Sequence, residues 1–418
     1  MTIMVIGGGR IQSYLVAAIQ RRGEKALVLD RDADCYCAGV ADYFEECDTL
    51  DHGKALDIAR RHKISGVMTA GTDVGYTVAY VAYHMGLPSC HPSAAYSAKN
   101  KYRMRDLINL DHPVWMRVAG SNPVAWEMKA HAKGIEPYPC VMKPVDMSAS
   151  RGISICRNQQ EYRVAYWKAL NESTSGTAIV EECLGFVDGE YSPGGHREVA
   201  IDAAVIDGVP YICNSAERVF SGAHEAIEVG FTAPAFPGRL PPAIDAICKK
   251  AVKALGVTEG PFKMDLIYDE RYGWCLLECT TRWSGSFDHN VAASWARGRD
   301  FSDDLVEYAI TGKFRDDLKT LHNYPPARYV ANYCPFFAPG QVITEDIMDL
   351  YRTSPGVIDV IKTRDVQPPL NSLVARCLFV FASGETIAEA WGKCVEADNH
   401  RKRVDAAIYA KEYNNDKG

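Results

Sequence analysis

The amino-acid sequence predicts a protein of mixed α/β and α+β class that begins with a doubly wound parallel sheet. In the first hundred residues, short apolar runs at 3–7, 26–30 and 65–70 alternate with segments of helical periodicity. Further along, apolar strands are separated by polar, glycine-containing turns. The 418 residues are 47% apolar and 24% charged, which is typical of a globular chain long enough for two to four domains.

Charge and composition exclude several classes of protein. The formal net charge is −7, which argues against general nucleic-acid binding. No window approaches the roughly 18 consecutive apolar residues that a membrane helix needs. The start of the chain, MTIMVIGGGR, lacks the basic segment of a signal peptide. The 14 cysteines are scattered without any C-x-x-C pair, which favours free thiols over disulfides or zinc. We therefore expect a cytoplasmic protein.

A glycine turn joins the first strand to a helix over residues 11–19. Gly7, Gly8 and Gly9 form the G-x-G of a dinucleotide fingerprint, but Gln12 stands where the third glycine belongs. A tight structural turn, an anionic substrate group docked on the helix N-terminus, and a dinucleotide whose ribose meets Asp30 all fit this pattern. We name Gly9 and Asp73 as possible substrate contacts.

Two lysines and a loop of small residues follow in the middle of the chain. Lys101 opens a helix that runs to Leu110, and Lys143 ends an apolar strand. The segment 146–153, DMSASRGI, can close its backbone N–H groups over phosphates, which an inward lysine would neutralise. A solvated helix lysine and an ordinary hairpin tip are the structural alternatives.

Carboxylates mark two further strands. The apolar run at 178–180 leads into Glu181 and Glu182, and Glu190 follows a glycine turn. Residues 262–266 and 276–282 predict a hairpin in which period-two alternation places Lys263 with Asp265, and Glu278 with Thr280 and Arg282. Two carboxylates on neighbouring strands suit Mg²⁺ (or Mn²⁺) carrying nucleotide phosphates. The alternative is a cross-strand polar pair on a solvated face.

The order of these four groups resembles the ATP-grasp superfamily, in particular its carboxylate–amine ligase and carbamoyl-phosphate-synthase-like branch. The resemblance implies a three-domain ATP-grasp architecture with ATP and Mg²⁺ as cofactors. It implies nucleotide contacts at Lys101, Lys143, Ser148, Ser150, Arg151, Gly152, Glu181, Glu182, Cys183, Leu184 and Glu190. It implies metal ligands at Asp265, Glu278 and Thr280, and catalytic roles for Lys263 and Arg282.

The sequence departs from the family pattern at two places. Relatives usually carry E-x-N on the second metal strand, whereas this chain has Glu278-Cys279-Thr280. A hydroxyl replaces an amide oxygen there, which leaves open whether one or two metals bind. The spacing after Glu181 also leaves open whether Asp188 or Glu190 meets the ribose. Arg218, on a strand that faces the acceptor pocket in relatives, is either a ligand for a substrate carboxylate or part of an ion pair.

The resemblance implies an enzyme that joins a small-molecule carboxylate to an amine through an acyl phosphate and releases ADP and phosphate. We divide the chain into an α/β domain at 1–97, an ATP-grasp domain at 98–320 with a flap at about 125–190, and a C-terminal α/β lid at 321–418. A carboxylase or carbamoyl-type enzyme using carboxyphosphate, a nucleotide-binding protein without turnover, and a dinucleotide-dependent oxidoreductase are the alternatives. We expect no nucleic-acid or membrane partner, with a homodimer as a possible assembly.

The small-residue loop gives a first test. If residues 147–152 close over ATP phosphates, trypsin should cleave after Arg151 rapidly in the free protein and slowly once an ATP analogue and Mg²⁺ are added. Limited proteolysis followed by mass spectrometry of the fragments measures both rates. Equal resistance in the two states would show that the loop is a rigid turn.

Overall fold

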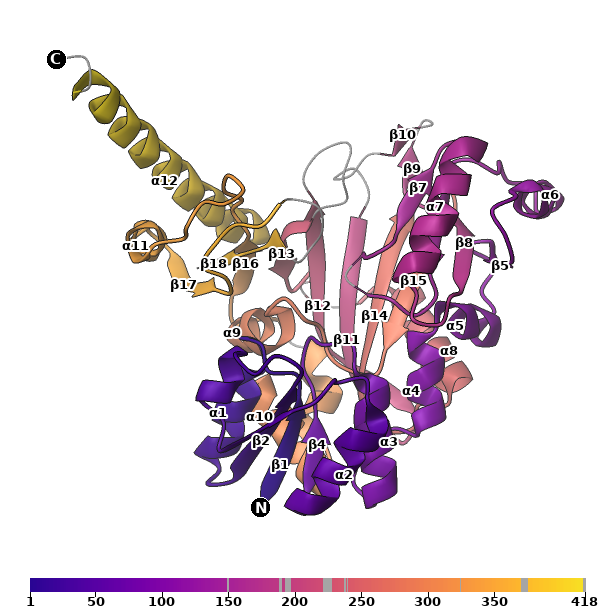
Figure 1. The fold of residues 1–418 in the computed structure, drawn as a ribbon, viewed down its shortest axis with the longest axis horizontal. Helices are drawn as coiled ribbons and strands as arrows, with labels where there is room; N and C mark the ends of the chain where they lie inside the picture. The colour runs from indigo at the N-terminus through magenta and orange to yellow at the C-terminus, as the bar shows by residue number, and fades with distance from the viewer. Residues whose placement is uncertain are drawn as a thin grey trace.

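The structure is a computed structural model that describes residues 1–148, 150–187, 190–191, 197–220, 228–236, 238, 240–323, 325–369 and 375–415 (Figure 1). In this part of the chain the strands form three sheets of four or more strands and one two-stranded ribbon. The ribbon pairs β9 (Phe186–Val187) with β10 (Glu190–Tyr191). The Glu190 side chain and Asp188 lie outside the described residues, so the ribose prediction made for them stays a prediction.

The first sheet is parallel, with strand order β3-β2-β1-β4. Alternate residues of β1 and β2 face opposite sides, and both sides are covered by helices. Helices α2 and α3 cover one side, and α1 and α10 cover the other, which confirms the doubly wound prediction. The elements are β1 (Thr2–Ile6), α1 (Ser13–Arg21), β2 (Lys25–Asp30), η1 (Tyr36–Gly39), β3 (Tyr43–Glu46), α2 (His52–His62), β4 (Gly66–Met68), α3 (Gly75–Met85) and α10 (Phe301–Thr311).

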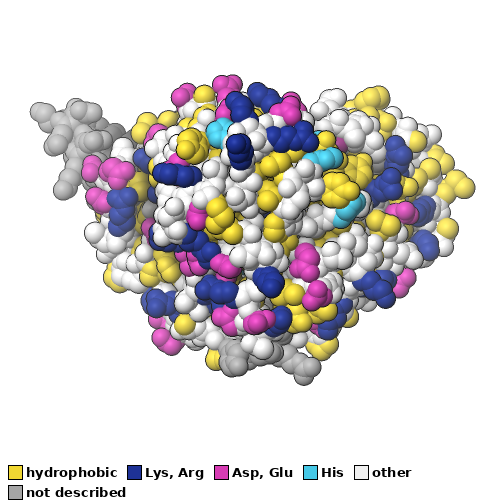
Figure 2. Space-filling model, turned by 90° about the horizontal axis from the view of Figure 1, so that it is seen from below, with side chains coloured by type: hydrophobic (Ala, Val, Ile, Leu, Met, Phe, Trp, Pro, Cys, Tyr) yellow, Lys and Arg dark blue, Asp and Glu magenta, His cyan; other side chains and the backbone are white. Residues whose placement is uncertain are grey.

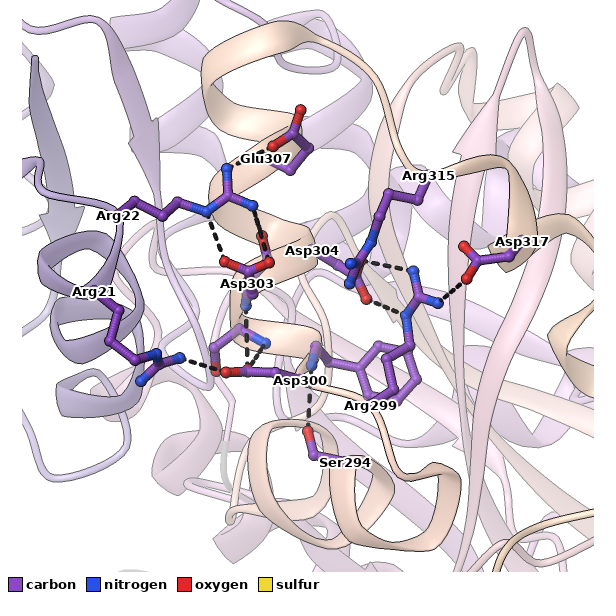
Figure 3. A network of polar contacts seen from close by, with 12 residues as sticks. Arg21, Arg22, Ser294, Arg299, Asp300, Asp303, Asp304, Glu307, Arg315 and Asp317 are labelled. Carbon is purple, nitrogen blue, oxygen red and sulfur yellow. Dashed lines mark hydrogen bonds and ion pairs between the residues drawn. The ribbon is translucent and has the colours of Figure 1, made fainter.

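Ion pairs fasten α10 to α1 across this layer, as Figure 3 shows. Arg22 contacts Asp303 at 2.6 Å and Glu307 at 2.5 Å, and Arg21 contacts Asp300. On the other side of α10, the fully buried Asp304 lies between Arg299 and Arg315. Because α10 belongs to a segment some 200 residues after the first sheet, residues 1–97 do not supply all the layers around that sheet.

A four-stranded antiparallel sheet of order β5-β8-β6-β7, seen at the upper right of Figure 1, is called the flap below; it begins at Trp115, before the segment of about 125–190 predicted as the flap, and that prediction stays a prediction. Helices α6 and α7 pack on it around Trp126 and Tyr162, two of the largest fully buried side chains. Two short helices, α4 and α5, connect it to the first sheet. The bounds are α4 (Pro92–Lys99), α5 (Lys101–Ile108), β5 (Trp115–Val118), α6 (Val124–Ala132), β6 (Cys140–Pro144), β7 (Ser154–Cys156), α7 (Gln159–Glu172) and β8 (Ala178–Glu182).

The largest sheet has eight antiparallel strands in the order β15-β14-β11-β12-β13-β16-β18-β17. The C-terminal strands therefore continue the same sheet as the metal-strand hairpin β14–β15, through the pairing of β13 with β16. The division at 320/321 stays a prediction. The elements are β11 (Arg197–Ile206), β12 (Val209–Phe220), β13 (Glu228–Ala233), α8 (Pro242–Leu255), β14 (Gly260–Asp269), β15 (Gly273–Thr280), η2 (Asp288–Ala293), α9 (Ser294–Arg297), η3 (Asp316–Asn323), β16 (Tyr329–Tyr333), α11 (Glu345–Arg352), β17 (Val357–Lys362), β18 (Leu378–Gly384) and α12 (Ile387–Asn415).

Surface and thiol chemistry agree with the composition. The 14 cysteines are free thiols, and all except Cys35 are buried. Basic and acidic side chains are interspersed over the face seen in Figure 2. Within the described residues, no helix is both long enough and apolar enough to cross a membrane.

Substitution of Gly230 tests whether β13 and β16 pair in one continuous sheet, and substitution of Gly392 is its control. The two substitutions should change the free energy of unfolding in opposite directions. A Cβ at Gly230 on β13 would lie 2.0 Å from the Asn332 carbonyl oxygen on β16, whereas a Cβ at Gly392 in α12 meets nothing within 4 Å. Gly230→Ala should lower the free energy of unfolding by about 1–3 kcal/mol through overpacking. Gly392→Ala should raise it by up to about 1 kcal/mol through helix propensity. Denaturant titration measures both, and a neutral Gly230→Ala would contradict the β13–β16 register.

Candidate active site

Two neighbouring cavities are lined by residues of the flap, of the eight-stranded central sheet and of the segments beside them. The hinge cavity is lined by the β8 end at 181–184, by Lys101 and Lys143, and by apolar side chains of β6, β7, β14 and β15. The arginine cavity is lined by Arg218, Arg282 and Arg376, with Lys263 beside them. Four residues line both cavities: Ser148, Ser150, Arg218 and Glu278. Small molecules bound in the two cavities would therefore touch.

A buried trio of charges forms the back of the hinge cavity. Glu181 accepts hydrogen bonds from Arg105 at 2.7 and 3.1 Å and from Lys143 at 2.6 Å. Burial alone would raise the pKa of Glu181, but the charges of Arg105 and Lys143 outweigh it and lower the pKa to about 2. The stability that this carboxylate contributes is thus present above its ordinary pKa of about 4.3 and is lost as the pH falls toward 2.

The side chain of Glu182 braces the hinge. It accepts hydrogen bonds from the His112 ring at 3.0 Å, the Val114 N–H at 3.1 Å and the Tyr272 hydroxyl at 2.8 Å. The rings of His112 and Tyr272 stack with centroids 3.5 Å apart. Cys183 and Leu184 complete the hinge wall of the cavity, and both are buried.

The predicted metal carboxylates face each other. Asp265 on β14 is the register partner of Glu278 on β15, next to a bulge. Asp265 accepts from Lys263 at 2.5 Å and from Arg218 at 2.8 Å, and Glu278 lies 3.3 Å from Lys101. Burial would raise the pKa of Glu278, but the charges of Lys101, Lys263 and Arg218 lower it well below its usual range. Glu278 is therefore a carboxylate at neutral pH.

This pair fits a divalent cation that brings other ligands with it. The described residues hold no cluster of three or more His, Cys, Asp or Glu side chains that would enclose a metal. Two facing carboxylates are the usual protein share of a Mg²⁺ site, with phosphates and water completing the octahedron. Thr280 is turned to the first domain, where its hydroxyl donates to Asp73 at 3.2 Å.

The loop between the cavities is shaped by one glycine. Gly152 has φ +73°, and a Cβ there would lie 2.6 Å from the Pro144 side chain. Ser148 and Ser150 line both cavities, whereas Arg151 is exposed. The Lys101 ammonium donates to the Met147 carbonyl at 2.6 Å, so the helix lysine also holds the start of the loop.

Arg282 has an unusual environment. Its side chain is only 8% exposed, it lines the arginine cavity, and it donates to the Trp283 carbonyl at 3.0 Å. Its Nε has no hydrogen-bond partner, and no carboxylate of the described residues forms an ion pair with it. A buried guanidinium normally pairs with an anion, so this geometry calls for an anionic ligand.

The glycine turn of the first sheet does not reach either cavity. The Asp30 carboxylate accepts from the Gly8 N–H at 2.6 Å, and a Cβ at Gly8 would lie 2.3 Å from the Cys35 sulfur. Asp30 is therefore committed to the turn, which favours the structural interpretation over a ribose contact. Gly9 is exposed and lines neither cavity. The first domain instead contributes Gly71, whose Cα lies 3.0 Å from the position of a Cβ at Gly285.

Four functional candidates escaped the sequence reasoning. Arg105 stands one helical turn after Lys101, a spacing that would have revealed it. Glu198 lines the hinge cavity, and burial raises its pKa to about 7. It shares a strand face with Ala200 and Asp202, so alternation could have indicated it. Arg376 lines the arginine cavity from a loop and Asp288 from the start of η2, and neither belongs to a sequence motif.

Comparison with known proteins identifies the class. Residues 136–288 match the family model of the ATP-grasp domain. The formate-dependent phosphoribosylglycinamide formyltransferase of Chlorobaculum tepidum is 30% identical over 191 residues, 44% of this chain and 48% of the relative. That of Synechococcus sp. WH7803 is 29% identical over 189 residues. The chain thus spans about half the length of the curated relatives it matches. Residues 136–288 are thus similar to an ATP-grasp domain, and the predicted resemblance is confirmed.

Solved structures of similar fold cover nearly the whole chain. The L-amino acid ligase of Bacillus licheniformis has a TM-score of 0.75 at 19% identity and covers 96% of this chain and 97% of its own. The N5-carboxyaminoimidazole synthase of Aspergillus clavatus has a TM-score of 0.72 at 15% identity and covers 96% and 98%. These likenesses confirm the predicted α/β and α+β fold class over nearly the whole chain.

Arg105 offers a stability test of the buried trio. Arg105→Met leaves Glu181 with one of its two cationic partners and frees the Leu276 and Leu277 carbonyls, which Arg105 binds at 2.7 and 2.9 Å. We expect a loss of about 3–5 kcal/mol in the free energy of unfolding. Arg103→Met, on the exposed side of the same helix, should change it by less than about 0.5 kcal/mol. Equal effects of the two substitutions in urea titration would contradict the role of Arg105.

Proposed function

We propose that the protein is an ATP-dependent ligase that joins a carboxylate to an amine through an acyl phosphate and releases ADP and phosphate. The observation that carries the proposal is the meeting of the two cavities at Arg218 and Glu278, with the anion-seeking Arg282 in the second cavity. A phosphate donor in one cavity and a carboxylate in the other would then lie end to end, which supports direct phosphoryl transfer.

In this proposal the hinge cavity takes ATP. The adenine lies between Val141, Ile155, Ile267 and Leu277, which give the cavity its apolar walls. Hinge backbone at 182–184 offers hydrogen-bond groups at its edge, and Glu198 is a carboxylate within the same cavity that suits the ribose hydroxyls. Lys143, Lys101 and the loop 148–152 face the phosphates.

Asp265 and Glu278 would hold Mg²⁺ (or Mn²⁺), which neutralises phosphate charge when bound. Asp265 now pairs with Lys263 and Arg218, and it would exchange these contacts for the metal if the site were loaded. Those two cations then become available to anionic groups at the junction of the cavities. The arrangement thus supports a change of ion-pair partner at Asp265, from Lys263 and Arg218 to the metal.

The chain's own residues then do two things. Arg282 and Lys263 hold the substrate carboxylate so that one oxygen attacks the γ-phosphorus and ADP leaves with the bridging oxygen. The same two cations neutralise the oxyanion that forms when an amine attacks the acyl carbon, after which the C–O bond to phosphate breaks and the amine loses a proton. Enclosure by the loop keeps water from the acyl phosphate.

The similar proteins support this reaction class. The relatives' name describes a formate-dependent enzyme, and formate is a carboxylate. One of the proteins of similar fold is an L-amino acid ligase. The three-domain division, a homodimer, small-molecule carboxylate and amine substrates and a cytoplasmic location remain parts of the proposal.

The direct test measures ADP release across pairs of carboxylates and amines, with formate and L-amino acids included. We expect ADP only when ATP, Mg²⁺ and a matching pair are present, together with a new amide by mass spectrometry. ATP binding without ADP release for any pair would favour a nucleotide-binding protein without turnover. NADH binding that ATP does not displace would favour an oxidoreductase.

Glu278→Gln tests the metal assignment. It keeps the shape of the side chain but removes one of two facing carboxylates, so turnover at saturating Mg²⁺ should fall by roughly 100-fold or more. Glu270→Gln, in the exposed turn of the same hairpin, serves as the control and should retain activity. Wild-type turnover by Glu278→Gln would show that this residue is no metal ligand.

A further inference from the structure

The segment after β15 lines the arginine cavity, and its backbone conformation is unfavourable without supporting contacts. Ser284, Gly285, Ser286 and Asp288 all line the cavity. Ser286 and Phe287 have φ of +57° and +63°, in the left-handed region that non-glycine residues avoid. Two such residues in succession persist only where the surroundings over-determine them. A π-helical turn, Asp288–Ala293, follows directly, which is a feature frequent at functional sites.

One buried carboxylate holds both ends of this segment. Asp202 on β11 is fully buried. It accepts hydrogen bonds from the Ser284 N–H at 2.8 Å and from the Ser284 hydroxyl at 2.9 Å, and its other oxygen lies 2.9 Å from Nδ1 of His289. Burial would raise the pKa of Asp202, but His289 and Lys263 lower it, so the group stays an acceptor. The segment 284–289 is thus pinned at its first and last residues.

The same carboxylate reaches the cavity through an amide. Nδ2 of Asn214 on β12 lies 3.3 Å from Asp202 and donates to Asp288 at 3.0 Å. Asp288 lines the arginine cavity and is only 4% exposed. Burial and the charge of Asp202 raise the pKa of Asp288 to about 8. Asn214 therefore fixes which way a buried carboxyl group of the cavity points.

A second clamp acts from the C-terminal strands. Arg376 donates to the Ser286 hydroxyl at 2.7 Å and pairs with Glu228 at 2.8 Å. The Phe287 ring packs on Phe379 with centroids 4.9 Å apart. The tip of the segment is thus held from one side, while Asp202 holds its two ends from beneath.

We propose that Asp202 is a positioning residue for the amine substrate: it holds residues 284–289 in place and, through Asn214, aims Asp288 into the arginine cavity. The inference rests on the proposed ligase function and deepens it, because it assigns amine recognition to this segment. An amine attacks an acyl carbon as the free base, and Asp288 lines the cavity with a carboxyl group that Asn214 holds in place, so an oxygen of that group can accept a hydrogen bond from the amine N–H. Asp202 touches no substrate itself.

Asp202→Asn tests the proposal. An amide N–H₂ replaces one oxygen and opposes either the Ser284 or the His289 donor. In the ligase assay we expect the KM for the amine to rise roughly 10- to 100-fold, while the KM for ATP changes by less than about 2-fold. Asn214→Ala, which leaves the contacts of Asp202 with Ser284 and His289, should shift the amine KM in the same direction. It keeps the proposal testable if Asp202→Asn does not fold.

Asp304→Asn is the matched control. Asp304 is as fully buried as Asp202 and is likewise paired, with Arg299 and Arg315, but it lies in α10 outside both cavities (Figure 3). It should lower thermal stability without separating the two KM values. If both substitutions affect ATP and amine kinetics equally, Asp202 is merely structural and the proposal is overturned.

Hydrogen exchange separates this inference from the ligase proposal. In Asp202→Asn, amide exchange of residues 284–289 should accelerate by about 10-fold or more, with the hinge at 181–184 unchanged. Asp304→Asn should leave 284–289 unchanged. If the wild type releases no ADP with any substrate pair, the ligase proposal fails while the exchange result still decides whether Asp202 holds the segment. Unchanged exchange at 284–289 overturns the positioning role.

Discussion

A chain of buried charges at the junction of the two cavities constrains the rest of the molecule. It runs from Arg376 to Glu228 at 2.8 Å, to Arg218 at 3.1 Å, to Asp265 at 2.8 Å and to Lys263 at 2.5 Å. Buried charges are tolerated only where partners lie in register. Because these residues come from β12, β13, β14 and the segment before β18, the central sheet has to be continuous across the ATP-grasp body and the C-terminal strands.

The same constraint explains the position of the flap and the first sheet. Arg105 ties α5 to Glu181 of the flap and to the carbonyls of β15, so the hinge is fixed relative to Asp265 and Glu278. Gly71 and Gly285 bring the first sheet against the segment that closes the arginine cavity. The ion pairs of Arg22 then fasten α10 to α1. Each of these contacts fixes the position of one element relative to the two cavities.

Sequence reasoning succeeded where chemistry is encoded locally. Lys143 ends a strand and precedes a loop. Asp265 and Glu278 lie on two strands of one hairpin, so their spacing alone predicted that these two carboxylates lie close together. It failed where residues meet only through tertiary structure. Arg376 lies about 150 residues from Glu228, and Asp288 follows two left-handed residues, Ser286 and Phe287, neither of which is a glycine. The sequence of α10 likewise shows only an ordinary amphipathic helix, and its packing on the first sheet is seen only in the folded structure.

In the proposed reaction an oxygen of the substrate carboxylate attacks the γ-phosphate of ATP. This step is tested most directly by supplying a productive carboxylate labelled with ¹⁸O in both oxygens and analysing the released phosphate by mass spectrometry. The account predicts one ¹⁸O atom in each phosphate and one retained in the amide product. Unlabelled phosphate, with the ¹⁸O atom that the amide loses recovered in water, would contradict an acyl phosphate and with it the assignment of the two cavities.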